Sequence, residues 1–142
     1  MRFVRLTLGV ACSGCLALNA TPAIGQTTGA IIGWGDMVVT DTAALENVVR
    51  VAAGVFHSLV VTSGGTVVPW GNSFFGQCAV PAPNADYVAV AAGFWHSLGL
   101  KAGGSVAAWG SNNDDQCEVP APNGGYTAVA AGVAHSVGLK DD

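Results

Sequence analysis

The sequence predicts an all-β protein built from a repeated unit of 39 residues, and three observations support this fold class. First, residues 49–71 (VRVAAGVFHSLVVTSGGTVVPWG) and 88–110 (VAVAAGFWHSLGLKAGGSVAAWG) match without a gap, and 127–142 begins the unit a third time. Second, each unit divides into short apolar runs separated by turn residues, as strands do. Third, no sustained helical period occurs outside the N-terminal segment. Self-similarity at this period is typical of stacked repeats and of β-propellers.

The second unit shows the expected strands most clearly, at residues 88–92, 97–100 and 105–109. The turn at 102–104 contains two glycines, which tolerate the positive φ that tight hairpins need. A fourth strand is expected around 117–119, and Pro120 would end it. Four short antiparallel strands in about 40 residues is the size of one propeller blade.

The sequence that links the units repeats as well. Residues 76–87 (GQCAVPAPNADY) match 115–126 (DQCEVPAPNGGY), so the linker belongs to the unit. An earlier partial copy, AIIGWGD at 30–36, matches the strand that closes each unit. The distance from Trp34 to Gly54 is 20 residues, against 23 from Trp70 to Gly93, so the first linker is three residues shorter.

The first 25 residues have the pattern of an export signal. Residues 1–5 carry two arginines and no acid, 6–20 are uncharged and mostly apolar, and Ala23-Ile24-Gly25 provides a small-residue cleavage site. The apolar run is shorter than the roughly 20 residues that a membrane helix needs. We therefore expect a signal helix that is cleaved after Gly25, and a secreted or periplasmic product without a membrane anchor. A buried N-terminal helix and a lipoprotein at Cys12 are the alternatives.

The charge balance excludes two classes of partner. The formal net charge is −4, and past residue 25 the chain keeps three cations and nine acids. Proteins that bind duplex nucleic acid rely on Lys and Arg to displace counterions, so we expect no nucleic-acid partner. A polybasic membrane patch is excluded on the same grounds.

At the level of the motif, the unit resembles the repeat of the regulator-of-chromosome-condensation (RCC1) superfamily. The resemblance rests on AVAAG, HSLGLK, GGSV and AWG, followed by Gln-Cys-x-Val-Pro, and it covers residues 30–142. The short period is most similar to a bacterial branch that includes the β-lactamase inhibitor protein II type of propeller. The resemblance implies a β-propeller, which closes with seven blades in that family. WD-type propellers differ, because here Gly follows the Trp.

The mature segment, residues 26–142, is too short for seven such blades. It has room for about two and a half to three blades of 39 residues, and residue 142 aligns with Gly103 inside a hairpin. We therefore expect an incomplete propeller, a fragment or a truncated frame, whose open strand edges make self-association possible. Assembly of several chains into a closed ring is the alternative.

The periodic His and Cys residues are of types that bind metals or form disulfides, but their spacing argues against both. His57, His96 and His135 are 39 apart, so they occupy one structural position in successive units. Such positions diverge around a ring, whereas zinc needs ligands about 2.0–2.1 Å from one point, so we expect backbone-bonded turn residues and no metal. Cys78 and Cys117 are likewise expected to stay free. The chain shows no catalytic motif, so we expect no enzyme activity and no cofactor.

The positions that differ between matching units are the candidate binding residues. They lie just before each His and just after each Trp-Gly: Phe56, Asn72, Phe74, Phe75, Phe94, Trp95, Asn112, Asn113 and Asp114. In the inhibitor propellers that the unit resembles, these segments face one side of the disc and contact the partner. Aromatic residues dominate interface hot spots. Packing between blades is an equally good interpretation for Phe56, Phe75 and Phe94, whereas Phe74 and Trp95 are expected to be exposed.

These observations predict a secreted protein–protein interaction module whose partner the sequence does not identify. The alternative is a truncated or structural repeat protein with no binding activity of its own. Guanine-nucleotide exchange, the activity that names the superfamily, is a distant third, because it does not fit export, acidity or the missing blades.

Overall fold

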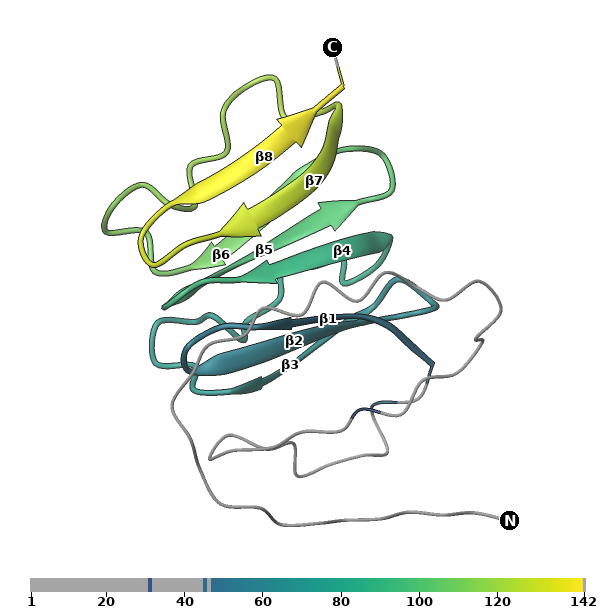
Figure 1. Ribbon diagram of the computed structural model, residues 1–142, viewed down its shortest axis with the longest axis vertical. Coiled ribbons are helices and arrows are strands. Elements are labelled where there is room, and N and C mark those ends of the chain that lie inside the picture. Colours follow the sequence, from purple (N-terminus) through teal and green to yellow (C-terminus); the bar gives the residue numbers. More distant parts are fainter. Residues whose placement is uncertain (1–30, 32–44, 46, 142) are drawn as a thin grey trace.

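The computed structural model describes residues 31, 45 and 47–141, and its strands form three small antiparallel sheets (Figure 1). The first sheet has the order β1-β2-β3, the second β4-β5-β6, and the third contains β7 and β8. The strands are β1 (Val48–Ala53), β2 (His57–Thr62), β3 (Val67–Gly71), β4 (Tyr87–Ala92), β5 (His96–Lys101), β6 (Val106–Gly110), β7 (Tyr126–Ala131) and β8 (Ser136–Lys140). The predicted signal segment lies outside the described residues.

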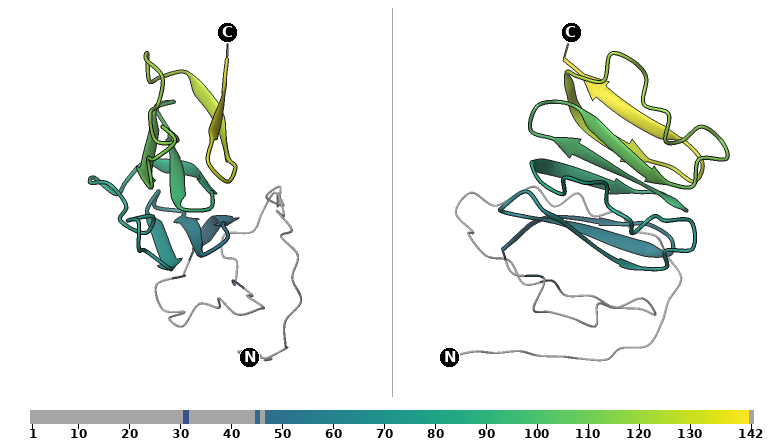
Figure 2. Two further views of the ribbon diagram at one scale, coloured as in Figure 1. Left: turned by 90° about the vertical axis from the view of Figure 1, so that its left-hand side faces the viewer. Right: turned by 180° about the vertical axis from the view of Figure 1, so that it is seen from behind.

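The three sheets, hereafter units one to three, follow one another along the long axis of the molecule (Figures 1 and 2). Neighbouring units meet through β2 and β4, and again through β5 and β7. The all-β prediction is confirmed, and the predicted strands differ from the observed ones by one residue at most of their ends. Among the described residues, no helix is long and apolar enough to cross a membrane.

The predicted fourth strand is wrong for both complete units. Residues 117–119, and the equivalent residues 78–80, form turns and irregular loop instead. In unit one a side chain takes the place of the strand. Asn84 Oδ1 accepts a hydrogen bond from the Val67 N–H, and Asn84 Nδ2 donates to the Val67 carbonyl, both at 2.8 Å. Asn123 and Val106 repeat this pair in unit two. The linker therefore runs beside the third strand without pairing to it.

The larger apolar core lies between units one and two. It joins side chains of the first sheet to others of the second: Leu59, Val61, Val67, Tyr87 and Trp109. The Trp109 indole N–H donates a 2.8 Å hydrogen bond to the carbonyl of Gln77, so this buried polar atom is satisfied. Because each core needs strands from two successive units, the stack is stabilised by the contacts between its units.

Small residues sit where the repeat is most crowded, at the Ala-Ala-Gly that ends the first strand of each unit. A Cβ placed on Gly93 would lie 2.7 Å from the carbonyl oxygen of Gly132 and would also clash with the His96 ring. The glycine therefore lets the turns of successive units approach each other closely.

One pair of neighbouring residues on the first two strands of a unit differs in side-chain size from unit to unit. Tyr87 packs its ring over Gly99, and a Cβ at Gly99 would clash with that ring. Unit three repeats the arrangement with Tyr126 over Gly138. Unit one instead has Val48 and Val60 at the two positions, so a smaller first residue accompanies a larger second one.

We predict that Gly99→Val destabilises the fold by about 1–3 kcal/mol, because it overpacks the space under Tyr87. In a Tyr87→Val background the same change should cost less, by at least about 1 kcal/mol, since this double variant restores the Val-Val pair of unit one. Denaturant unfolding of the four proteins of this cycle measures the coupling. Additive effects would show that the two side chains do not compete for space.

Candidate functional site

The two sets of variable segments come together on one side of the stack, at the left in Figure 1. The turn between the first two strands of a unit is tied by the backbone to the loop after its third strand. The Asn72 N–H donates to the carbonyl of Phe56, and the Ser111 N–H donates to that of Trp95, both at 2.8 Å. The segments that the sequence singled out therefore form one surface.

Five aromatic side chains on this surface form a continuous group, hereafter the aromatic cluster: Phe56, Phe74, Phe75, Phe94 and Trp95. Phe56 of unit one stacks on Trp95 of unit two, with ring centroids 4.3 Å apart and planes 15° from parallel. Phe94 meets both rings edge-on at 5.0 Å. Phe75 lies 5.1 Å from Trp95, and Phe74 lies 5.0 Å from Phe75.

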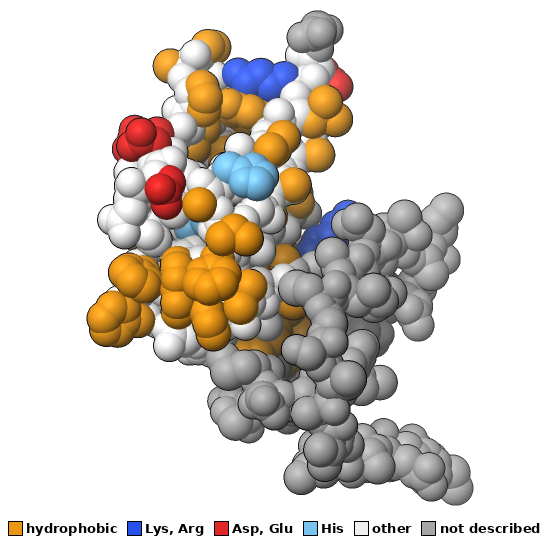
Figure 3. Space-filling model, turned by 60° about the vertical axis from the view of Figure 1, so that its left-hand side comes forward, with side chains coloured by type: hydrophobic (Ala, Val, Ile, Leu, Met, Phe, Trp, Pro, Cys, Tyr) orange, Lys and Arg blue, Asp and Glu red, His pale blue; other side chains and the backbone are white. Residues whose placement is uncertain are grey.

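Exposure differs across the aromatic cluster. Phe74 is 82% exposed and Phe75 39% exposed, whereas Phe56, Phe94 and Trp95 are half-buried. The expectation of an exposed side chain is met at Phe74, but Trp95 is more enclosed than predicted because Phe56 stacks on it. The aromatic cluster thus contains side chains that pack between units and side chains that are open to solvent. Figure 3 shows hydrophobic side chains gathered over the lower part of this face, with acidic side chains beside them.

The loop after β3 holds the two exposed phenylalanines in place. Asn72 Oδ1 accepts a hydrogen bond from the Phe74 N–H at 2.8 Å and another from Gln77 Nε2 at 3.3 Å. Gln77 Oε1 in turn accepts from the Phe75 N–H at 2.9 Å. The Oδ1 atom of Asn72 therefore shapes the loop, as short polar side chains commonly do in turns.

The equivalent loop after β6 is polar and acidic instead of aromatic. Asn112 Oδ1 accepts from the Cys117 N–H at 2.8 Å, and its Nδ2 donates to the Glu118 carboxylate at 2.9 Å. Asn113 and Asp114 are exposed, as are the neighbouring acids Asp115 and Glu118. The Asn112 side chain thus forms hydrogen bonds within its own loop. The carboxylates of this loop are exposed beside the aromatic cluster.

Two of the three periodic histidines, His57 and His96, contact a serine hydroxyl of the next unit, a partner that the sequence did not predict. His57 Nε2 and the Ser97 hydroxyl of the next unit are 2.8 Å apart, and that hydroxyl donates to the Gln77 carbonyl at 2.9 Å. His96 and Ser136 repeat the contact at 3.1 Å. Both imidazoles are almost fully buried. Among the described residues, no group of three or more His, Cys, Asp or Glu side chains could hold a metal ion.

Burial also sets the charge of these histidines. Loss of solvation lowers the pKa of His57 to about 4, and the neighbouring His96 adds to this effect. The pKa of His96 is lowered mainly by burial. Both rings are therefore neutral at pH 7.

We predict that the free energy of unfolding falls as the pH is lowered from about 6.5 to about 4. In this window the unfolded chain protonates His57 and the folded chain does not, so protons favour unfolding. Above pH 6.5 the contribution is complete, and below pH 4 it decreases no further. Denaturant unfolding of wild type and of His57→Gln across this window tests the assignment. An equally steep pH dependence in the variant would contradict it.

The two cysteines of the repeat are free thiols, as predicted. Each donates weakly to a carbonyl within its own loop, Cys78 to Asn72 and Cys117 to Ser111. Burial raises the pKa of both thiols, so they favour the protonated form. Both thiols thus take part in hydrogen bonds within the variable loops.

Comparison with known protein families identifies the repeat. The family model described as "Regulator of chromosome condensation (RCC1) repeat" matches residues 48–77 and again 87–116. Units one and two of this chain match the RCC1 repeat. Each match begins at the first strand of a unit and ends in the variable loop, so units one and two are two RCC1 repeats in register. No curated protein matches the chain.

Several solved structures of longer proteins share the fold of this chain. Prp20p from Saccharomyces cerevisiae is 23% identical with a TM-score of 0.59, over 68% of this chain and 32% of its own. Yeast RCC1 (Prp20) bound to Kap60 is 25% identical with a TM-score of 0.55, over 68% and 30%. Human WBSCR16 is 20% identical with a TM-score of 0.55, over 66% and 33%. The chain spans about a third of the length of these proteins, and its units are consecutive β-propeller blades.

The repeat of this chain contains two groups that recur at the same position in successive units and that the sequence did not single out as functional. Ser97 and Ser136 each follow a His directly, and Gln77 and Gln116 each precede a Cys, at the 39-residue spacing. The carbonyl of each Gln receives the Ser hydroxyl of the next blade. The repeated His-Ser and Gln-Cys pairs were the available signal, but the contact joins atoms about 20 or 40 residues apart and needs the blade geometry.

Proposed function

We propose that this RCC1 repeat protein is a secreted module that binds another protein through the aromatic cluster and the acidic loop beside it. The observation that carries the proposal is the continuous aromatic cluster, which reaches from the half-buried Phe56–Trp95 stack to the 82% exposed Phe74. A large aromatic side chain held in fixed geometry and open to solvent is the usual composition of an interface anchor.

The chemistry of this face indicates the kind of partner that fits it. The aromatic cluster supplies an apolar centre, and Asp114, Asp115 and Glu118 supply negative charge next to it. We therefore expect a partner surface with an apolar centre and a basic rim, since charge complementarity steers association. Known relatives support a protein partner in general terms. Prp20p was studied for its binding to Gsp1p and histones, and yeast RCC1 has been solved with Kap60.

The experiment compares capture of partners by immobilised mature chain, by Phe74→Ala and by Val88→Ala. Val88 is 43% exposed on β4 and takes no part in the aromatic cluster, so it is the matched control. A partner that binds wild type and Val88→Ala, and at least about tenfold more weakly Phe74→Ala once purified, supports the proposal. Equal affinity for the three proteins, or no saturable partner, would favour a structural repeat without binding activity.

Export is a separate part of the proposal and has its own test. Residues 1–25 have the three regions of a secretory signal, so the exported protein is expected to begin at Gln26. Mass spectrometry of material from the medium or periplasm measures this directly. A cytoplasmic product that retains Arg2 and Arg5 would refute it.

A further inference from the structure

The loop after β3 and the loop after β6 carry different side chains on a matching backbone. The aromatic loop, residues 72–79 (NSFFGQCA), follows the third strand of unit one, and the acidic loop, residues 111–118 (SNNDDQCE), follows that of unit two. The first four residues differ at every position, whereas the Gln-Cys pair is common to both loops. Contacts that recur in both loops therefore do not depend on which of the two sequences is present.

A glutamine holds the tip of each loop. Gln77 Oε1 accepts the Phe75 N–H at 2.9 Å, and Gln116 Oε1 accepts the Asp114 N–H at 2.8 Å. Gln77 is fully buried and Gln116 is nearly so. Because a buried amide oxygen without a donor is costly, each glutamine favours the same backbone position for the residue two before it. That preference is independent of the side chain that the residue carries.

Three further features recur in the two loops. The Cys N–H donates to the side chain at the second loop position, which is Ser73 Oγ at 3.1 Å or Asn112 Oδ1 at 2.8 Å. Each cysteine thiol donates to the carbonyl of the first loop residue, at 3.5 Å and 3.3 Å. The residue before each glutamine has a positive φ, 80° at Gly76 and 58° at Asp115. Because a positive φ is uncommon outside glycine, its presence at both positions indicates a shared backbone path.

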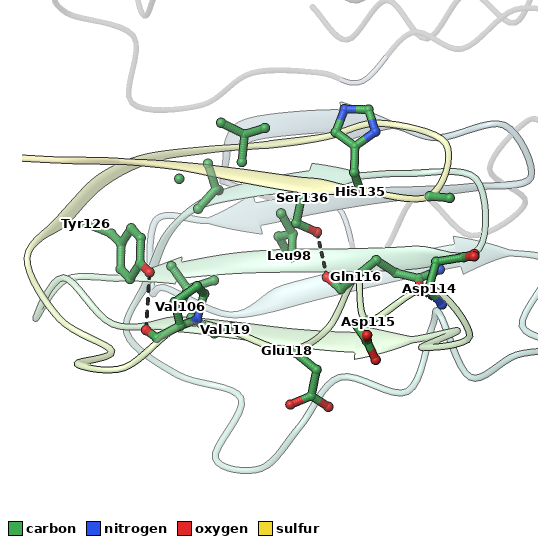
Figure 4. A pocket seen from close by; sticks show the side chains of 15 residues that line it. Leu98, Val106, Asp114, Asp115, Gln116, Glu118, Val119, Tyr126, His135 and Ser136 are labelled. Carbon is green, nitrogen blue, oxygen red and sulfur yellow. Dashed lines mark hydrogen bonds between the residues drawn. The ribbon is translucent and has the colours of Figure 1, made fainter.

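The following unit holds the main chain of each glutamine. The Gln77 carbonyl accepts the Ser97 hydroxyl at 2.9 Å, and the Gln116 carbonyl accepts the Ser136 hydroxyl at 2.7 Å (Figure 4). Each glutamine thus contacts the loop of its own unit through its side chain and the next unit through its carbonyl. Buried polar groups that are paired in this way rigidify their surroundings. The variable residues of each loop are therefore carried on a support in which the glutamine recurs unchanged.

We propose that residues 72–75 and 111–114 are interchangeable recognition segments, and that Gln77 and Gln116 are their positioning residues. The first segment brings aromatic rings to the binding face, and the second brings amides and a carboxylate. The contribution of each unit to specificity is set by four residues, while the support beneath them stays the same. This inference rests on the proposed function, because a segment takes part in recognition only if this face binds a partner.

The first experiment swaps the two segments within the mature chain, which leaves the amino-acid composition unchanged. The segment-swapped protein carries Asn72→Ser, Ser73→Asn, Phe74→Asn, Phe75→Asp, Ser111→Asn, Asn112→Ser, Asn113→Phe and Asp114→Phe. Hydrogen exchange should show the amides at positions 75 and 114 protected to within about threefold of wild type, because the glutamines accept the same N–H groups. A purified partner of wild type should bind at least about tenfold more weakly, because the aromatic rings have moved to the next unit.

The second experiment removes the side-chain acceptor of each loop in turn. Gln77→Met should raise the hydrogen-exchange rate of the Phe75 amide at least about tenfold and leave that of the Asp114 amide unchanged. Gln116→Met is the matched control and should give the reverse result. Both variants retain the main-chain carbonyl at the substituted position, so the serine contact from the following unit is kept. Gln77→Met should also weaken partner binding at least about fivefold more than Gln116→Met does, since it releases the exposed aromatic rings.

Loss of protection at position 75 or 114 in the segment-swapped protein would overturn the proposal, because the support would then depend on the segment that it carries. An unchanged Phe75 amide in Gln77→Met would refute the positioning role of the glutamine. Equal partner affinity of wild type and the segment-swapped protein would refute the recognition role and leave the proposed function standing. If wild type binds no partner, the proposed function and the recognition role both fail, while hydrogen exchange still decides whether the two loops share one support.

Discussion

Trp109→Ala is expected to lower the free energy of unfolding by about 3–5 kcal/mol, the largest stability effect of any single substitution considered. The indole is 7% exposed, packs with Leu59, Val67 and Tyr87, and satisfies the Gln77 carbonyl. Its removal leaves a cavity between blades and breaks a buried hydrogen bond. Denaturant unfolding at a fixed protein concentration measures the loss.

The matched comparison is Trp95→Ala, which removes the same side chain from the aromatic cluster. Trp95 is half-buried and lies on the surface face, so its removal should cost less than half as much stability. Equal destabilisation by the two substitutions would show that Trp95 is a core residue, and the aromatic cluster would lose its central member as a binding group.

The largest effect on binding is expected at Trp95. Its replacement by alanine should weaken binding of the partner by at least about 2 kcal/mol, as truncation of a hot-spot residue does. Trp95 stacks on Phe56 and supports Phe75, so the substitution removes a contact and also loosens its neighbours. Isothermal titration of the purified partner with wild type and variant gives the difference.

Phe74→Ala separates these two contributions. Phe74 is 82% exposed and contacts Phe75 at the rim of the aromatic cluster, so its removal should change binding while the melting temperature stays close to that of wild type. Unchanged binding in Phe74→Ala together with a loss in Trp95→Ala would place the contact on the Phe56–Trp95 stack. Unchanged binding in both would refute the aromatic cluster as the binding face.

The repeat period alone was enough to predict the fold class and most of the strands, because each blade solves the same packing problem with the same residues. The linker strand was mispredicted for a local reason. Val80 and Val119 look like strand residues, but Asn84 and Asn123 occupy the backbone groups of β3 and β6 that such a strand would pair with. An apolar run between prolines does not reveal this competition.

The candidate site was predictable in position but not in detail. Variation between matching units selected all five aromatic residues that the structure brings together. It did not show that Phe56 would cover Trp95, because that stack joins side chains 39 residues apart across two blades. The pairing of His57 with Ser97 escaped prediction for the same reason.

The asparagine that replaces the fourth strand also determines how copies of this protein are able to meet. Asn84 saturates the outward N–H and carbonyl of Val67, and Pro69, which points the same way two residues later, has no N–H to offer. The outer rim of unit one is thus a poor template for lateral pairing into fibres. The same asparagine that shapes this blade therefore also protects its outer edge from sideways aggregation.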